Sequence, residues 1–185
     1  MAAVDRARLE SGLGHVGAAP ADRGRLELVV TRPGEEQRVL AESGRLDLEA
    51  GVAGDMWSWR PTSTTADGRP NPDAQVTVMS SRAAALVADS PEHADWAEAG
   101  DQLYVDLDLS ADNLPPGTRL AIGGAVLEVT AAPHLGCGKF SRRFGVDALK
   151  VVNSETGRRM RLRGLNAKVV VAGEIAVGDE VTKLG

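Results

Sequence analysis

The segment Arg119-Leu-Ala-Ile-Gly-Gly-Ala-Val-Leu-Glu-Val-Thr130 decides the fold class of this chain. Two short runs rich in Leu, Ile and Val flank Gly123-Gly124, and a glycine pair in this position predicts a β-hairpin with a two-residue primed turn. The second arm leads into Pro133-His-Leu-Gly-Cys-Gly-Lys-Phe-Ser-Arg-Arg-Phe-Gly145, which holds the only cysteine. The hairpin therefore predicts antiparallel β-structure that presents this cysteine segment.

Similar short runs recur along the chain, separated by glycine, proline and other turn-forming residues. The runs typical of strands are residues 25–30, 45–49, 75–79, 103–109, 165–171, 174–177 and 180–182. Fewer segments favour helices, namely 82–88, 90–99 and 140–150, and residues 61–72 and 153–161 are predicted as polar loops. A parallel α/β sheet would need regular crossover helices, which this pattern lacks. The sequence thus predicts a mainly β fold, a closed or nearly closed β-barrel of short, largely antiparallel strands with a few short helices.

The length and composition fit one domain. The chain has 185 residues, of which 43% are hydrophobic and only 3% aromatic, so its core must consist mostly of Val, Leu, Ala and Ile. We expect an N-terminal extension at residues 1–22 and a single domain at 23–185. No run approaches the ~20 apolar residues of a membrane span, and charges between residues 5 and 10 interrupt any signal-peptide core. We therefore expect a cytoplasmic protein with no membrane partner.

Cys137 has neighbours that favour a reactive thiolate. Gly136 and Gly138 flank it, and a lysine and two arginines follow within six residues. Nearby cations or a helix N-terminus lower a cysteine pKa from about 8.5, and the thiolate is the form that attacks electrophiles or binds a soft metal. The alternative is a buried structural cysteine, since free cysteine is among the most buried residue types. Such a residue would normally lie among apolar neighbours.

Positive charge is concentrated around and after this cysteine. Residues 139–168 contain nine basic residues and two acidic ones, a net charge of +7, which leaves −12 for the rest of a chain whose total is −5. A discrete basic patch on an acidic protein predicts an anionic small-molecule ligand more than a nucleic acid. The alternative, a solvated arginine-rich loop, is equally compatible with the charge alone.

Several chemistries can be tested on residue spacing. A zinc centre would need three or four ligands, whereas Cys137 has only three histidines in the whole chain to join it. A P-loop fails because proline stands where its first glycine is required. A Cys-His hydrolase using His134 lacks a third partner. Cys137 and Arg143 do satisfy Cys-x5-Arg, the spacing with which phosphatases and rhodaneses hold an oxyanion, so that alternative stays open.

The chain as a whole resembles the MOSC domain, the family named for the C-terminal domain of molybdenum cofactor sulfurases, and looks like a small stand-alone bacterial member. The resemblance runs from about residue 25 to 181. It is carried by Gly51-Val-Ala-Gly-Asp, Gly100-Asp-Gln-Leu-Tyr-Val-Asp-Leu-Asp-Leu, Leu114-Pro-Pro-Gly-Thr-Arg-Leu-Ala-Ile-Gly, Ala125-Val-Leu-Glu-Val-Thr, the Pro133–Gly145 segment, Arg163-Gly-Leu-Asn-Ala-Lys-Val-Val and Gly178-Asp-Glu-Val. Gln102 departs from the family, which often has asparagine there.

The resemblance implies a barrel similar to that of pyruvate kinase and a functional cysteine corresponding to Cys137. Family members are proposed either to carry sulfur as a cysteine persulfide, received from a pyridoxal-phosphate desulfurase, or to ligate molybdenum of the molybdenum cofactor. The second role includes relatives that reduce N-hydroxylated compounds with electrons from a partner reductase. This chain lacks the pyridoxal-phosphate domain of full-length sulfurases, so we expect it to bind no pyridoxal phosphate.

This resemblance and the local charges together define a set of candidate site residues. Cys137 is the chemical centre or metal ligand, and His134 is a proton donor or hydrogen-bond partner. The residues expected to bind the cofactor or hold its anionic group are Gly136, Gly138, Lys139, Arg142, Arg143, Arg163 and Asn166. Because adjacent helical residues point about 100° apart, at most one of Arg142 and Arg143 is expected to face the thiol.

Overall fold

The hairpin at residues 119–130 forms as predicted in the computed structural model, which describes residues 3–61 and 65–185. Strand β7 (Arg119–Ile122) pairs antiparallel with β8 (Ala125–Val129), and Ile122 faces Ala125 across a two-residue turn. Gly123 has a φ of +52°, which primed turns require and which glycine adopts without strain. A Cβ there would lie 2.4 Å from Asp179 Oδ2, so the turn also needs glycine for space.

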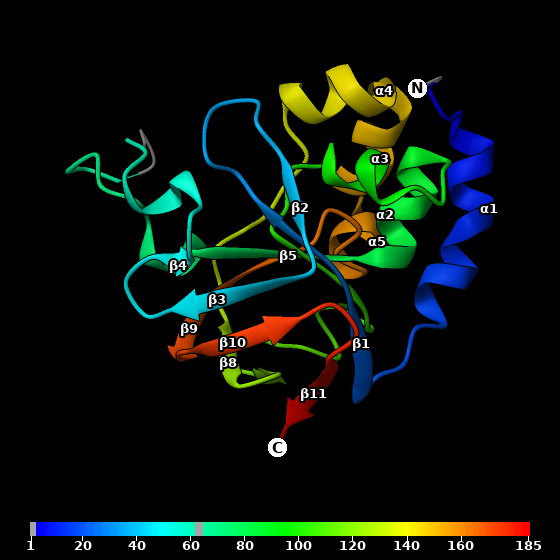
Figure 1. Ribbon diagram of the computed structural model, residues 1–185. Helices are drawn as coiled ribbons and strands as arrows, with labels where there is room; N and C mark the ends of the chain where they lie inside the picture. The colour runs from blue at the N-terminus through cyan, green and yellow to red at the C-terminus, as the bar shows by residue number, and fades with distance from the viewer. Residues whose placement is uncertain (1–2, 62–64) are drawn as a thin grey trace.

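Seven strands close into a barrel around this hairpin (Figure 1). Their order is β11, β7, β8, β9, β5, β6 and β1, and the pairing of β1 with β11 closes the ring. The remaining barrel strands are β1 (Arg23–Thr31), β5 (Val76–Ser80), β6 (Leu103–Asp106), β9 (Leu165–Val171) and β11 (Glu180–Leu184). The prediction of a mainly β, closed barrel is confirmed.

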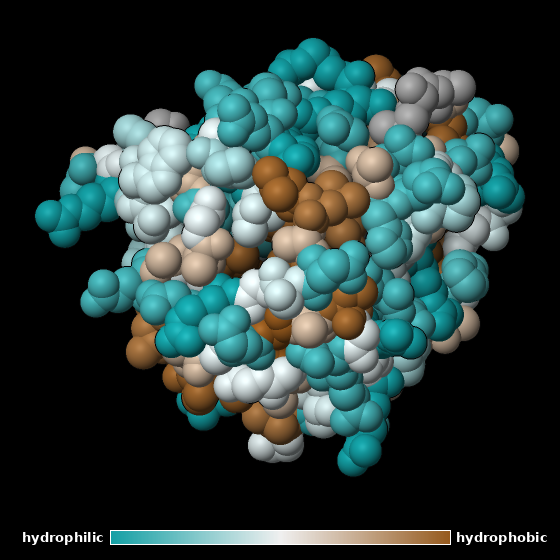
Figure 2. Space-filling view, viewed as in Figure 1, coloured by the Kyte–Doolittle hydropathy of each residue, from teal (hydrophilic) through white to brown (hydrophobic). Residues whose placement is uncertain are grey.

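Four short strands lie outside the ring. Strand β2 (Val39–Ala41) extends the sheet from β1, and a separate three-stranded sheet contains β3 (Ser43–Asp47), β4 (Gly51–Val52) and β10 (Gly173–Ala176). The space-filling view shows apolar surface gathered over β2 (Figure 2), where Val39 and Leu40 are 48% and 43% exposed. Strand β2 therefore presents an apolar edge to the outside.

One strand pair departs from the predicted antiparallel pattern. Strands β5 and β6 are parallel, and the chain between them forms helices α2 (Ser81–Ala88) and α3 (His93–Ala97). This single crossover agrees with a largely antiparallel barrel, because the regular crossover helices of a parallel α/β sheet are still lacking. The strand predicted at 103–109 ends at Asp106, and the helix predicted at 90–99 is confined to five residues.

The remaining helices cover the outside of the barrel at one end (Figure 1). Helix α1 (Arg6–Gly17), which begins at an Asp5 cap, packs on α2 and α4, although the sequence predicted no helix there. Helix α4 (Gly138–Asn153) is longer than predicted and is interrupted at Gly145, whose φ is +89°. The predicted polar loop at 153–161 is wrong, because Ser154 caps a short helix, α5 (Glu155–Arg159). None of the helices in the described residues combines the length and hydropathy needed to span a membrane.

Two apolar cores explain why several strands consist almost entirely of hydrophobic residues. The barrel interior contains Leu26, Val78 and Leu103, whereas Tyr104 and Met79, on the opposite faces of β6 and β5, pack with the helices. Strands buried on both faces lose the polar alternation of a half-exposed sheet. The helical layer thus holds the start of α4, with the cysteine segment, against the outside of the barrel.

Candidate functional site

Cys137 lies between the end of β8 and the first turn of α4. It is the residue before the helix and it is exposed. Partial burial raises the pKa of the Cys137 thiol, but the backbone N–H groups of Phe140 and Lys139 and the positive charge of Arg163 outweigh it. The net pKa therefore lies below the ordinary value of a thiol, which favours the reactive thiolate.

The loop that carries Cys137 is held at several points. Asn153 Oδ1 accepts from Gly136 N at 2.9 Å, and its Nδ2 donates to Gly136 O at 3.0 Å. Asn166 Nδ2 donates to the carbonyls of Ala132 and Pro133, both at 3.2 Å. A Cβ on Gly136 would lie 2.9 Å from Leu149 and Val152, so this glycine permits the loop to pack on α4. Gly136 and Asn166 thus position the cysteine loop.

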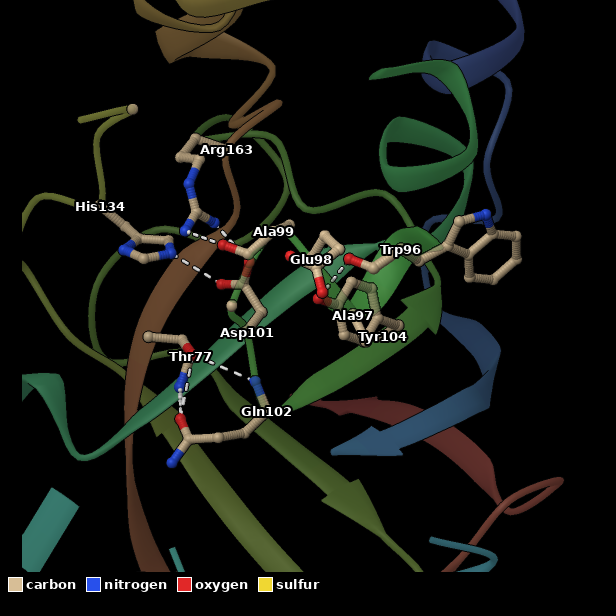
Figure 3. A network of polar contacts seen from close by, with 12 residues as sticks. Thr77, Trp96, Ala97, Glu98, Ala99, Asp101, Gln102, Tyr104, His134 and Arg163 are labelled. Carbon is tan, nitrogen blue, oxygen red and sulfur yellow. Dashed lines mark hydrogen bonds and ion pairs between the residues drawn. The ribbon is translucent and has the colours of Figure 1, made fainter. Parts of the chain in front are cut away.

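His134 belongs to a buried polar network centred on Asp101 (Figure 3). His134 Nε2 lies 2.7 Å from Asp101 Oδ1, and Arg163 Nη1 donates to Asp101 Oδ2. The Asp101 side chain is fully buried, and those of His134 and Arg163 are 16% and 9% exposed. Gln102, the next residue, accepts through Oε1 from the backbone N–H and the hydroxyl of Thr77. The network therefore ties the cysteine loop to the barrel strands β5 and β6.

The charges in this network set the protonation state of His134. Burial lowers the pKa of His134 and the Arg163 guanidinium lowers it further, more than Asp101 raises it. Burial raises the pKa of Asp101, but Arg163 and His134 outweigh burial and keep that pKa below its usual range. With Asp101 ionised and His134 neutral, Nε2 carries the imidazole proton and donates to Asp101. The Nδ1 atom is then a proton acceptor, and His134 is a hydrogen-bond partner of Asp101 through Nε2.

Four arginines bind four consecutive carbonyls just upstream of Asp101. Two come from the connection between β1 and β2, one from α4 and one from the turn before β9, and each donates to one residue in the stretch 97–100. The pairs are Arg38 with Ala97 O, Arg143 with Glu98 O, Arg163 with Ala99 O and Arg32 with Gly100 O. Carbonyls at a helix C-terminus carry partial negative charge, so the end of α3 attracts cations. These bonds fix the backbone that carries Asp101.

The predicted anion-holding residues near the thiol have carboxylate partners from the loop between β1 and β2. Lys139 Nζ lies 3.1 Å from Glu35 Oε1 and 3.0 Å from Glu36 Oε1, and Arg143 Nη2 also binds Glu36. Arg142 Nη1 instead lies over the first turn of α4, 3.8 Å from the Cβ position of Gly138. Arg142 therefore lies over the thiol end of the helix, whereas the Arg143 guanidinium is bound to Glu36 and Glu98.

Two clefts lie on either side of residues 133–134, and His134 lines both. The arginine cleft, of about 310 Å³, is lined by Pro116, Thr130, Ala131, Ala132, Pro133, His134, Leu135, Val152, Gly157, Arg158, Arg161, Arg163, Gly164 and Leu165. The tryptophan cleft, of about 450 Å³, is lined by Arg32, Met56, Trp57, Arg60, Pro61, Pro70, Asn71, Ala74, Thr77, Pro133, His134 and Asn166. The predicted loop at 61–72 contributes to the second cleft, although residues 62–64 lie outside the described residues.

Some residues of the site were not predicted from the sequence. Asp101 lies in the Gly100-Asp101 motif, but the motif gives no sign that its carboxylate meets His134 across 33 positions. Asp55 accepts from Trp57 N and binds Arg32 Nε at 2.8 Å. A buried acid and a basic partner far away in the sequence produce no local sequence pattern. Only the Gly100-Asp101 motif could therefore have indicated Asp101.

Comparisons with solved structures and with family models identify what this chain is similar to. The YuaD protein from Bacillus subtilis has a TM-score of 0.59 at 19% identity, over 86% of this chain and 94% of that one. YiiM from Escherichia coli has a TM-score of 0.55 at 20% identity, over 87% of this chain and 70% of that one. Both likenesses show the fold alone, and no curated protein sequence matches. A family model of the MOSC domain matches residues 45–182, well over half of the sequence, and the chain therefore belongs to the MOSC domain family.

Proposed function

We propose that this chain is a cysteine-centred sulfur carrier in molybdenum cofactor metabolism, acting in the cytoplasm, with Cys137 holding the sulfur as a persulfide. The observation that carries the proposal is the exposed Cys137 thiol, whose pKa is lowered at the start of α4. Cys137 lines neither cleft, so another protein can reach its sulfur. An enzyme that encloses its substrate would instead place the reactive group inside a cavity.

The transfer step is a thiolate exchange. The Cys137 thiolate attacks the terminal sulfur of a persulfide on a donor protein, a new S–S bond forms at Cys137, and the donor thiolate leaves. The donor would be a cysteine desulfurase that uses pyridoxal phosphate. Two electrons of the broken S–S bond leave with the donor sulfur, so the step needs no external oxidant or reductant.

The surroundings of Cys137 suit this step. The N–H groups at the start of α4 favour negative charge on the thiolate before transfer and on the persulfide afterwards. His134 Nδ1 can accept a proton, because Nε2 carries the imidazole proton and donates it to the Asp101 carboxylate in a hydrogen bond. The apolar edge of β2 follows the loop whose Glu35 and Glu36 contact Lys139, which favours a protein partner docking beside the cysteine segment.

Molybdenum cofactor binding is a second candidate, favoured by the two clefts that border His134. The donor set fits: one exposed thiolate is a suitable ligand for a soft metal that brings further sulfur ligands with its pterin. Cys137 would ligate the metal, and of the residues predicted to bind the cofactor Asn166 lines the tryptophan cleft and Arg163 the arginine cleft. When bound, the group would supply two-electron redox chemistry, and reduction of N-hydroxylated compounds would then need electrons from a partner reductase.

The Cys-x5-Arg alternative receives no support from the geometry. The donors of Arg143 go to Glu98 O, Glu98 Oε2 and Glu36, away from an anion held at the thiol. Phosphatases and rhodaneses of this kind need the arginine fork directed at the anion beside the sulfur. We therefore do not propose a phosphatase or rhodanese activity.

Mass and elemental analysis of the purified protein tests the two candidates together. The chain and its Cys137→Ser variant would be produced in a host that makes molybdenum cofactor and incubated with a cysteine desulfurase and cysteine. We expect a reducible adduct of ~32 Da, one sulfur atom, on Cys137 and none on the variant. Stoichiometric molybdenum and pterin lost in the variant would instead establish the cofactor-binding function.

The pH dependence of alkylation provides a second readout that needs no partner. Reaction of Cys137 with iodoacetamide should have its midpoint below about 8.5, the pKa of a free thiol. A midpoint at or above that value, together with neither sulfur nor molybdenum on the protein, would contradict both candidates.

A further inference from the structure

The arginine cleft has an unusual charge balance for an acidic protein. Three of its lining residues are arginines and none is an aspartate or glutamate, although the chain as a whole has a net charge of −5. Its positive charge lies on one wall, at the end of α5 and the start of β9. Leu135, two residues before Cys137, is one of the apolar residues that line the same cleft.

The three arginines differ in how their charge is balanced. Arg163 is paired with the buried carboxylate of Asp101 (Figure 3). Arg161 is half-buried, its Nη1 donates only to the carbonyls of Leu114 and Leu109 at 2.7 and 3.4 Å, and burial alone lowers its pKa. Arg158 is exposed, and within residues 3–61 and 65–185 neither it nor Arg161 has a carboxylate at ion-pair distance. The cleft therefore carries two uncompensated positive charges.

The backbone segment that carries Arg158 and Arg161 is fixed by its surroundings. Arg161 has a left-handed φ of +49°, a conformation that few residues other than glycine adopt, and its N–H donates to Arg158 O at 3.1 Å. Gly157 sits so close to α4 that a Cβ would lie 2.1 Å from Val151 O. The segment that carries both arginines is thus fixed against α4, and a strained backbone held by its surroundings is typical of ligand-binding positions.

We propose that the arginine cleft is a phosphate-binding site for a small phosphorylated molecule, with Arg158 and Arg161 as the residues that hold the phosphate. Two uncompensated cations match a dianion, and guanidinium groups bind phosphate oxygens through pairs of charge-assisted hydrogen bonds. The exposed side chain of Leu135 gives the cleft an apolar surface for an apolar or planar group attached to the phosphate. This inference goes beyond the proposed function, because the site requires neither sulfur nor molybdenum on Cys137.

The neighbouring residue Arg159 provides a matched control. It lies on the same helix and is exposed like Arg158, but it lines a different hollow, with Leu109 and Asp112. Replacing either arginine with glutamine removes one charge from the same helix, so any effect of net charge is common to both variants. Only Arg158→Gln removes a proposed phosphate ligand.

Calorimetric titration of the full chain with phenyl phosphate and with inorganic phosphate tests the site. We expect phenyl phosphate to bind more tightly than inorganic phosphate, and Arg158→Gln to weaken its binding about tenfold, the effect of losing one charge-assisted hydrogen bond. Arg159→Gln and Cys137→Ser should bind like the unchanged chain. Equal weakening in the Arg158 and Arg159 variants, or no binding of phenyl phosphate at millimolar concentration, would overturn the proposal. Retained binding by Cys137→Ser separates this site from the function of the cysteine.

Discussion

Two ionic networks flank the cysteine segment, and they differ in burial. In the Asp101 network a fully buried carboxylate binds Arg163 and His134, whose side chains are 9% and 16% exposed. In the Glu36 network the carboxylate is 55% exposed and binds Lys139 and Arg143, which are 42% and 17% exposed. Each network thus places one acid between two basic side chains on the same face of the site.

The difference in burial predicts different roles. Water cannot replace a missing partner inside the Asp101 network, so each charge there depends on the others. Water and salt readily replace Glu36, because exposed ion pairs contribute little to stability. We therefore infer that the Asp101 network fixes the geometry of the cysteine loop, whereas the Glu36 network adjusts the charge that an approaching reagent meets.

The largest effect is expected from Asp101→Asn. This change leaves the Arg163 guanidinium buried beside an uncharged amide and removes the charge that His134 Nε2 contacts. Breaking a buried ion pair by removing one partner typically destabilises a protein by about 3–5 kcal/mol. Urea unfolding followed by circular dichroism would measure the change. A loss no larger than that of Glu36→Gln would show that burial does not separate the two networks.

An intermediate effect is expected from pH. Because the pKa of His134 is lowered from 6.5 in the folded protein, the unfolded chain binds a proton more readily there. Stability should therefore fall as the pH decreases below about 6.5, where the unfolded histidine becomes charged. The lowered pKa of Asp101 adds a further loss only below its ordinary value of 3.8, and that of Glu36 only below 4.5.

The variant His134→Gln isolates the histidine contribution. Its side-chain amide can still donate to Asp101, but it does not titrate. Urea midpoints at pH 7.5, 6.5 and 5.5 should decline in the unchanged chain and decline less in this variant. Parallel declines in both proteins would mean that other groups cause the acid sensitivity.

The barrel could be predicted from the sequence because its signals are local. The Gly123-Gly124 turn marks the hairpin of β7 and β8, and the short apolar runs bounded by glycine or proline mark the other strands. The parallel pairing of β5 and β6 was missed although both helices of its crossover were predicted, because a single crossover gives no repeated alternation of strand and helix. Helix α1 was missed because, apart from Leu9 and Val16, it buries little, so its sequence shows a weak apolar stripe.

The candidate site was predicted only in part for a different reason. Cys137 and its basic neighbours are adjacent in the sequence, so their chemistry was visible. The partners that balance those charges come from distant segments: Glu36 is 107 positions from Arg143, and Asp101 is 62 from Arg163. Charge counted along the sequence overstated the cations available at the thiol, because Lys139 and Arg143 are already paired in the fold.

The smallest effect is expected from Glu36→Gln, and it concerns reactivity more than stability. Glu36 has a left-handed φ of +58°, which glutamine adopts no more easily than glutamate, so the urea midpoint should change little. Removing its charge leaves Arg143 and Lys139 less neutralised beside Cys137. The ratio of the alkylation rates with anionic iodoacetate and neutral iodoacetamide should then rise about twofold at low salt, as expected for one unit charge acting through water.

Glu10→Gln is the control for this last comparison, since Glu10 is also an exposed acid in an ion pair, with Arg6 of the same helix, α1. It changes the net charge by the same amount but leaves the surroundings of Cys137 intact. In 1 M salt, where the Debye length is about 3 Å, the ratio for Glu36→Gln should return to that of the unchanged chain. An equal rise in both variants would mean that the whole-protein charge, and not the Glu36 network, governs which reagents reach the thiol.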